Sequence, residues 1–314
     1  MTVSSDRIIH WLQQLVQIPS VNPAGHKELD VRMGEGQMAA FLAEQLEGFG
    51  GWVELEEVFP QRPNVYAFFS GRSDKLAVVD VHMDTVDVTQ MIDPPFDGRV
   101  ENGRMWGRGV VDTKATMGIM LALLERLHWR NEKPKYNLLI VGTVSEEYGG
   151  FGAKTFAKWA RRKNVQIDQL LVAEPTLCGP IYAHKGVMGG TVYIHGRPAH
   201  SSTPEEGANA ITAAAHVILA IDAEHKRLKA EPAKTALGHG VIAATVIEGG
   251  SGHNVIPDSC RVVVNRRLTA FESPEEEQAR LTKLVEDASP LPVTVEFRSG
   301  LPALYQEPDS PWVQ

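Results

Sequence analysis

The first part of the chain alternates short apolar runs with amphipathic segments. Short apolar runs predict buried strands, and apolar positions that recur every three or four residues predict helices. The first helix is expected to begin after Ser4 and Ser5 and to end near Pro19. Further helices are predicted at about 34–47, 113–128 and 151–161, and strands at 76–81, 138–144 and 170–173. Strands that alternate with helices favour an α/β fold, a mostly parallel sheet flanked by helices on both faces.

The pattern changes after Lys185. Strands are predicted at 187–195, 241–248, 261–268 and 293–298, with helices at 205–228 and 274–287. The order βαββαβ is that of a ferredoxin-like sandwich. We therefore expect a first domain over residues 1–184, an inserted domain over residues 185–298, and the start of a segment returning to the first domain at 299–314.

Composition narrows the class of protein. A length of 314 residues favours two domains, and a net charge of −8 argues against binding to nucleic acid or anionic membranes. No apolar run approaches the ~20 residues that span a bilayer, and the N-terminus does not resemble a signal peptide. The two cysteines are too few for a disulfide framework. We expect a cytoplasmic protein with no nucleic-acid or membrane partner.

Polar residues gather where the predicted strands of the first domain end. The candidates are His82, Asp84, Asp112, Glu146, Glu147 and Glu174. Ligand sites in open α/β sheets form beyond the carboxyl ends of strands, so these side chains are expected to converge. Each short pattern alone is common on protein surfaces. One imidazole with several carboxylates at three strand ends, however, favours a site for a divalent metal.

Two of these groups have a further expected role. In the pair Glu146-Glu147, one carboxylate can bind metal while the other takes a proton from metal-bound water. Asp84 can accept a hydrogen bond from the His82 nitrogen that faces away from the metal, which would fix the imidazole tautomer.

The sequence resembles a family of co-catalytic dizinc hydrolases over essentially its whole length. That family includes aminoacylase, acetylornithine deacetylase, succinyl-diaminopimelate desuccinylase and the glutamate carboxypeptidases. The resemblance rests on Val81-His-Met-Asp-Thr-Val, Gly107-Arg-Gly-Val-Val-Asp-Thr-Lys, Val144-Ser-Glu-Glu, Ala173-Glu-Pro, Gly196-Arg-Pro-Ala-His-Ser-Ser and Gly249-Gly-Ser-Gly-His-Asn-Val-Ile-Pro-Asp. Their order and spacing make the resemblance specific.

The resemblance implies a role for each residue of the metal site. His82 and Glu174 would bind the first zinc, Asp112 would bridge two metals, Glu147 would bind the second, and Glu146 would be the general base. The cofactors would be two divalent ions, zinc or alternatively cobalt or manganese. The implied substrate is an N-acyl amino acid or a peptide cleaved at its C-terminal bond, because glutamate at position 174 goes mostly with deacylases and carboxypeptidases.

The resemblance also assigns residues of the inserted domain. His200 would reach across a homodimer interface to stabilise the oxyanion, and Asn254 would contact substrate. Arg267 would bind the substrate carboxylate, although the neighbouring Arg266 is an alternative and Asn265 stands where the family usually has an acidic residue. The dimer would form through an exposed sheet edge of this domain.

One family feature is missing from the sequence. The second metal of the family takes its last ligand from a histidine near the C-terminus, and no histidine follows Asn254. Ser310 and Pro311 also look like the start of a helix. We therefore expect a fragment, about the N-terminal four-fifths of the enzyme. Other possibilities are that His184 or His253 completes the site, that the protein is a dipeptidase, or that it is a non-catalytic remnant that binds metal or dimerises.

Overall fold

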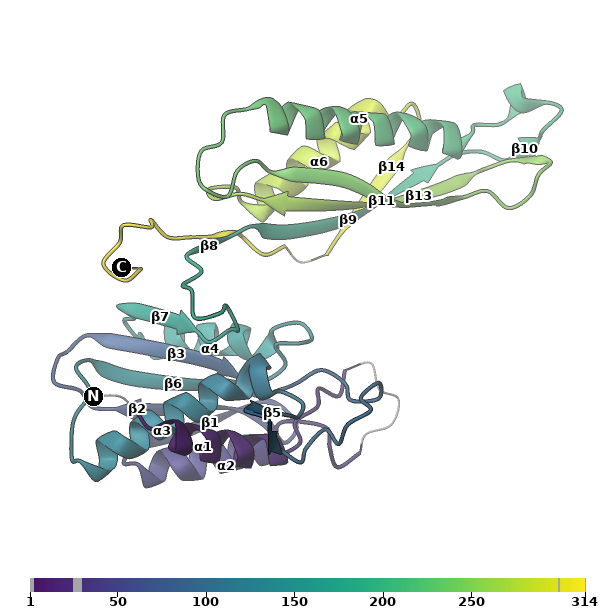
Figure 1. Ribbon diagram of the computed structural model, residues 1–314. Coiled ribbons are helices and arrows are strands. Elements are labelled where there is room, and N and C mark those ends of the chain that lie inside the picture. Colours follow the sequence, from purple (N-terminus) through teal and green to yellow (C-terminus); the bar gives the residue numbers. More distant parts are fainter. Residues whose placement is uncertain (1–2, 25–29, 299, 314) are drawn as a thin grey trace. The chain divides into compact units, whose positions relative to one another are not determined.

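The computed structural model describes residues 3–24, 30–298 and 300–313. The chain divides into two compact units, Met1–Cys178 and Gly179–Gln314, each with its own sheet and helices (Figure 1). The helices in the described parts of the chain are all too short or too polar to cross a membrane.

Helix α1 shows how closely the first unit follows its sequence pattern. The side chain of Ser4 caps α1 by accepting a hydrogen bond from the Arg7 amide, and the buried face carries Trp11 and Leu15. The helices of this unit are α1 (Ser5–Gln17), α2 (Gly36–Gly48), α3 (Ala115–Trp129) and α4 (Phe151–Arg162). All four predicted helices are present.

The sheet of the first unit is mixed. Its strands are β1 (Trp52–Phe59), β2 (Arg62–Phe69), β3 (Leu76–His82), β6 (Asn137–Thr143) and β7 (Gln169–Val172), in the spatial order β1-β2-β6-β3-β7. The pairs β3–β6 and β3–β7 are parallel, as predicted, whereas β1–β2 and β2–β6 are antiparallel. The antiparallel half exists because β1 and β2 form a hairpin that the sequence analysis did not predict.

Both faces of this sheet are covered, as predicted (Figure 1). Helices α1, α2 and α3 pack on one face, in a core that includes Leu15, Met38 and Leu121. Helix α4 packs on the other face, where Phe156 and Trp159 contact Tyr66. The small elements of the unit are β4 (Val100–Glu101), β5 (Arg104–Met105) and the π-helical turn η1 (Val110–Lys114).

The second unit has the predicted βαββαβ order. It consists of β9 (Gly186–His195), α5 (Ala210–Ala230), β11 (Val241–Gly249), β13 (Ser259–Leu268), α6 (Pro274–Ala288) and β14 (Val293–Phe297). The spatial order is β11-β13-β9-β14, all antiparallel, and α5 and α6 share one core with the sheet. The ferredoxin-like architecture is therefore confirmed. The short elements are β8 (Ala183–His184), β10 (Ala199–His200), η2 (Pro204–Glu206), β12 (Val255–Ile256) and β15 (Leu304–Tyr305).

Two boundaries differ from the predictions. The long helix begins at Ala210 instead of about 205, because Asn209 accepts hydrogen bonds from the amides of Ile211 and Thr212 and so caps it there. At the other end, residues 310–313 form a turn closed by the Val313 amide and the Ser310 carbonyl, and not a helix. Strand β15 pairs with β8 inside the second unit. The assignment of residues 299–314 to a return segment stays a prediction.

Candidate metal centre

The predicted metal ligands of the first unit meet at one edge of its sheet. His82 is the last residue of β3, Glu146 and Glu147 follow β6, and Glu174 follows β7. Because β6, β3 and β7 are adjacent and parallel, their carboxyl ends share this edge (Figure 1). Asp112 lies in η1, the turn just before α3.

Short distances join these side chains around the imidazole. Nε2 of His82 lies 3.0 Å from Oδ1 of Asp112 and 3.9 Å from Oε1 of Glu174. His82, Asp112 and Glu174 form one group whose ligand atoms lie within 4.8 Å of one another, and His82, Glu146 and Glu147 form a second. The imidazole is 2% exposed, whereas the side chain of Asp112 is 51% exposed. The buried imidazole therefore forms the floor of a site that is open to solvent on its carboxylate side.

The segment before α3 is fixed by side-chain contacts. Gly109 has a φ of 79°, and a Cβ on it would lie 2.8 Å from the Thr85 methyl group, so the chain needs glycine there. The Thr113 hydroxyl donates a short hydrogen bond to the carbonyl of Ala173. This bond links the residue after Asp112 to the residue before Glu174, which keeps the two carboxylates together.

The electrostatics of the cluster fit a cation. Burial opposes protonation of the His82 imidazole, but the carboxylates of Asp84, Glu174 and Glu146 outweigh it and raise the pKa of His82 to about 10. Burial, together with repulsion from neighbouring carboxylates, raises the pKa values of Glu146, Glu147 and Glu174. A divalent cation offsets such crowding of negative charge, so the donor set fits a metal.

Asp84 has contacts that the sequence analysis missed. Nδ1 of His82 lies 3.0 Å from the backbone oxygen of Asp84 and 3.5 Å from its carboxylate. The carboxylate accepts hydrogen bonds from the amides of Glu146 and Glu147, at 3.0 and 3.1 Å, and from the Asn22 side chain at 2.7 Å. Burial would raise the pKa of Asp84, but these donors and His82 hold it below its usual value. Asp84 thus orients both the imidazole and the Glu146-Glu147 turn.

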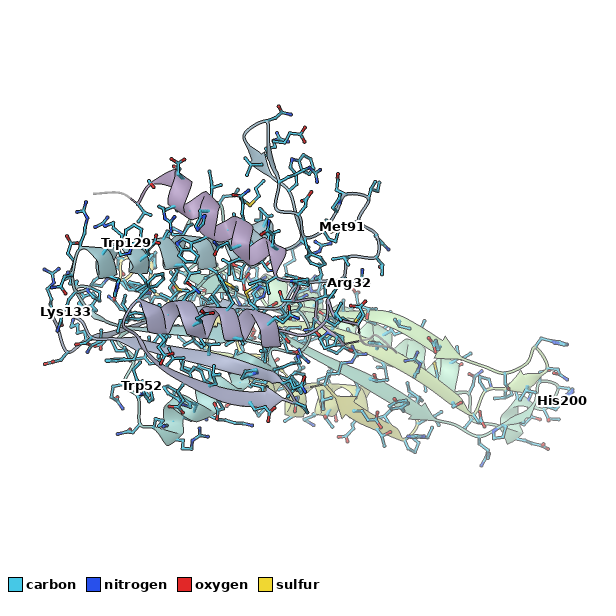
Figure 2. All side chains as sticks on the ribbon, turned by 90° about the horizontal axis from the view of Figure 1, so that it is seen from below. Arg32, Trp52, Met91, Trp129, Lys133 and His200 are labelled. Carbon is cyan, nitrogen blue, oxygen red and sulfur yellow. The ribbon has the colours of Figure 1, made fainter. Side chains whose placement is uncertain are left out.

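Two candidates of the second unit lie together. His200 pairs with Val255 in the β10–β12 ribbon, beyond the end of the four-stranded sheet (Figure 2), and its Nδ1 lies 2.7 Å from the Ser202 hydroxyl. The carbonyl of Asn254 accepts a hydrogen bond from the Ser201 amide. His200 and Asn254 are both exposed, so a substrate or a partner chain can reach them.

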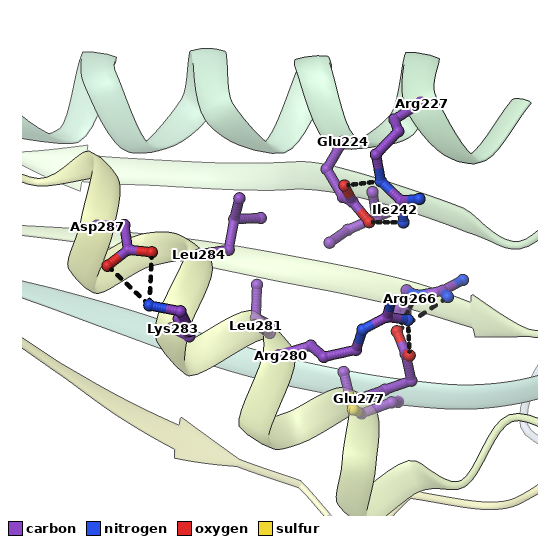
Figure 3. A pocket seen from close by; sticks show the side chains of 11 residues that line it. Glu224, Arg227, Ile242, Arg266, Glu277, Arg280, Leu281, Lys283, Leu284 and Asp287 are labelled. Carbon is purple, nitrogen blue, oxygen red and sulfur yellow. Dashed lines mark hydrogen bonds and ion pairs between the residues drawn. The ribbon is translucent and has the colours of Figure 1, made fainter. Parts of the chain in front are cut away.

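The structure separates the two adjacent arginines. Arg266 is buried, and its guanidinium contacts Glu277 (Figure 3) and also Glu272. Arg267 is exposed, because alternate residues of β13 face opposite sides of the sheet. Arg266 is therefore a structural residue, and Arg267 remains the candidate for binding a carboxylate.

Comparisons with known families match both units. A model of the M20-type peptidase dimerisation domain matches residues 182–291, and a model of peptidase family M28 matches residues 64–173. The chain is 29% identical over 298 residues to a probable carboxypeptidase of Aspergillus clavatus, covering 90% of this chain and 67% of that protein. It is 28% identical over 292 residues to a probable succinyl-diaminopimelate desuccinylase of Staphylococcus aureus, covering 85% and 69%. The chain thus spans about two thirds of the length of these relatives.

Solved structures share the fold. The aminopeptidase PepT of Bacillus cereus superimposes with a TM-score of 0.75 at 19% identity, over 98% of this chain and 79% of that one. This likeness extends through both units.

Proposed function

Because the chain belongs to the M20 family of metal-dependent peptidases and amidohydrolases, we propose that the protein hydrolyses an amide bond beside a free carboxylate. Its substrate would be an N-acyl amino acid or a peptide cleaved at its C-terminal bond. The observation that carries the proposal is that four carboxylates, those of Asp112, Glu174, Glu146 and Glu147, each bring an oxygen within 4.8 Å of a ring nitrogen of His82.

The donor set suits two divalent ions. His82 and Glu174 would hold the first ion, Glu147 would hold the second, and Asp112 would contribute to both. One imidazole with carboxylates suits zinc, and cobalt or manganese can occupy such sites. When bound, the ions polarise the amide carbonyl and lower the pKa of a water molecule.

Glu146 is the proposed general base. Burial, with the nearby Asp84 and Asp112, raises the pKa of Glu146 above its ordinary value, while His82 opposes the shift. A carboxylate shifted in this direction holds a proton more readily near neutral pH. Glu146 would take the proton of the attacking water and deliver it to the leaving amine.

The second unit would supply the substrate contacts. We propose that His200 stabilises the oxyanion in the site of a partner subunit, that Asn254 contacts the substrate, and that Arg267 binds its carboxylate through the guanidinium fork. The match to a dimerisation domain supports a homodimer. Strand β11 is an edge of its sheet and exposes Val246 and Ile247, which suits it to the interface.

The cysteines support a cytoplasmic location. Cys178 and Cys260 are both free thiols, which is the usual state in a reducing compartment.

Metal analysis and hydrolysis assays on one preparation test the proposal. We expect up to two metal ions per chain, the second held more weakly because the sequence lacks the histidine that the resemblance assigns to its site, and release of amino acid from N-acetyl, N-succinyl and N-blocked peptide substrates. Chelation should abolish hydrolysis, and added zinc should restore it. Glu146→Gln should retain its metal and lose about 10²–10⁴-fold in kcat.

Other outcomes decide between the alternatives. A metal-loaded protein that cleaves none of these amides would contradict the proposal and favour a binding protein. Cleavage restricted to dipeptides with a free amine would favour a dipeptidase.

A further inference from the structure

Buried side chains hold the segment that carries Glu146 and Glu147 through its backbone. Four successive amides, those of residues 144–147, each donate to a side-chain oxygen. The acceptors are Asn64 for Val144 (3.1 Å), Glu35 for Ser145 (2.9 Å), and Asp84 for Glu146 (3.0 Å) and Glu147 (3.1 Å). All three acceptors are buried. These buried acceptors therefore fix the backbone direction in which Glu146 and Glu147 leave the sheet.

Ser145 is the residue where the chain changes direction. Its φ is +60°, a left-handed conformation that residues other than glycine seldom adopt. Its carbonyl accepts a hydrogen bond from the Gly150 amide, and its hydroxyl donates one to the Tyr148 carbonyl. A residue in this conformation persists only where its surroundings hold it there, so the contact between its amide and Glu35 matters for the turn.

Glu35 is tied to one cation. Arg62 donates from a terminal nitrogen to Oε1 at 2.8 Å and from Nε to Oε2, in a two-pronged contact. The Glu35 carboxylate is 0% exposed and Arg62 is 15% exposed, with its guanidinium 4.7 Å from the centre of the Phe59 ring. The amide of Ser145 and the fork of Arg62 both bond to Oε1, so the position of Ser145 depends on the ion pair.

We propose that Glu35 and Arg62 are positioning residues for the reaction, which act through the Ser145 amide on the base Glu146 and the ligand Glu147. The inference rests on the proposed function. Neither residue touches the reacting atoms. The contact between Glu35 and the Ser145 amide lies at the turn after β6. Asp112 lies in η1 and Glu174 follows β7, so both are on other segments. Loss of the ion pair should therefore weaken metal binding at the position that Glu147 serves and impair Glu146 as the base. Metal binding at the position of His82 and Glu174 should not change.

A matched ion pair in the same unit provides the control. Glu125 is also buried and also accepts a two-pronged contact, from Arg7, but its further donor is the indole of Trp11 instead of a backbone amide of the site. Glu125→Gln should therefore reproduce the general cost of neutralising a buried carboxylate without disturbing the turn.

The test is a titration of the metal-free protein with cobalt(II), followed by its absorption spectrum, alongside steady-state kinetics. In Glu35→Gln we expect one of the two binding steps to weaken about 10–100-fold and the other to change less than about threefold. We expect kcat to fall about 10–100-fold with little change in KM. Glu125→Gln should leave both binding steps within about threefold of the parent.

A second variant and an exchange measurement keep the test decisive if Glu35→Gln folds poorly. Arg62→Lys keeps the charge opposite Glu35 but lacks the fork, and it should shift the same binding step by a smaller factor. Hydrogen exchange in metal-free protein should be faster for residues 144–147 in both variants than in Glu125→Gln.

The outcomes separate the two proposals. A parent protein that binds no pair of ions contradicts the proposed function, and the inference falls with it. A parent that binds two ions, with Glu35→Gln weakening both steps equally or behaving like Glu125→Gln, overturns only the positioning role.

Discussion

The ammonium group of Lys114 donates a 2.7 Å hydrogen bond to the carbonyl of Ile18, at the C-terminal end of α1. A second bond, of 3.0 Å, goes to the carbonyl of Leu15. Lys114 is buried and belongs to the segment that carries Asp112. The last carbonyls of a helix lack the amide that would follow four residues later. The Leu15 carbonyl also accepts the Ile18 amide, so Lys114 completes the C-terminal cap of α1 and anchors the Asp112 segment to it.

Replacing Lys114 should therefore destabilise the first unit. Lys114→Met keeps much of the buried volume but removes the side-chain donor to the Ile18 carbonyl and one of the two donors to the Leu15 carbonyl, which should cost about 1–3 kcal/mol in the free energy of unfolding. Urea denaturation measures the loss. Lys163→Met removes a half-exposed lysine that pairs with Glu54 and should stay within about 0.5 kcal/mol of the parent. Equal stability of the two variants would show that the contacts of Lys114 contribute nothing.

The pH dependence of hydrolysis should report on Glu146. A general base works in its deprotonated form, so the rate must fall as the pH drops through its pKa. Because burial raises the pKa of Glu146 above 4.5, we expect the acid limb of kcat/KM to lie above pH 4.5. Metal content measured at each pH separates protonation of the base from loss of the ions. A flat profile down to pH 4.5 with the metal retained would rule out Glu146 as the base.

Much of the fold could be predicted because most of its strands are recognisable from a short apolar run in the sequence. The run at 76–81 is apolar except for Asp80, and His82 follows it, so both the strand and the position of the imidazole follow from the sequence. The same holds for the strands before Glu146 and Glu174. Adjacent parallel strands place their carboxyl ends together, which is why residues far apart in sequence could be expected to form one site.

The hairpin of β1 and β2 could not be recognised in the same way. Strand β1 is a half-exposed edge strand with Glu54 and Glu56 among its residues, and β2 contains Pro63. A proline within a run argues against a central strand. Here Pro63 pairs only with Glu57 of the edge strand, close to the turn, so its missing amide is tolerated.

The contacts behind the site also have no local signature. Glu35 lies 110 residues before Ser145, yet its carboxylate accepts the Ser145 amide. A lone glutamate near a helix start looks like a solvated residue, and only the folded chain shows that it is fully buried. Ligand identities could thus be predicted from strand ends, whereas the residues that orient those ligands could not.

The proposed exchange of His200 between subunits can be tested by complementation. His200→Ala and Glu146→Gln should each lose most activity as homodimers. In a mixed dimer, the subunit with intact Glu146 would receive His200 from its partner, so refolding the two variants together should restore up to about a quarter of parental activity. No recovery from mixtures shown to contain mixed dimers would mean that His200 acts within its own chain or not at all. His195→Ala, at the end of β9, is a suitable control because that imidazole is exposed and contacts the hydroxyl of Thr294 on β14.

Replacing Arg266 should lower stability, whereas replacing the adjacent Arg267 should weaken substrate binding. Each arginine is therefore a control for the other. Arg266→Gln removes the buried cation that contacts Glu277 and Glu272 and leaves Glu277 paired with the more exposed Arg280, which should cost about 1–3 kcal/mol of stability. Arg267→Gln removes an exposed charge and should change stability by less than about 0.5 kcal/mol. If Arg267 binds the substrate carboxylate, its loss should raise KM about tenfold or more for N-acyl amino acids, the cost of one charge-assisted contact. An amidated substrate, which has no carboxylate, should be processed equally by the parent and by Arg267→Gln. An unchanged KM for the carboxylate substrate would leave Arg267 as an ordinary charge on the face of the sheet.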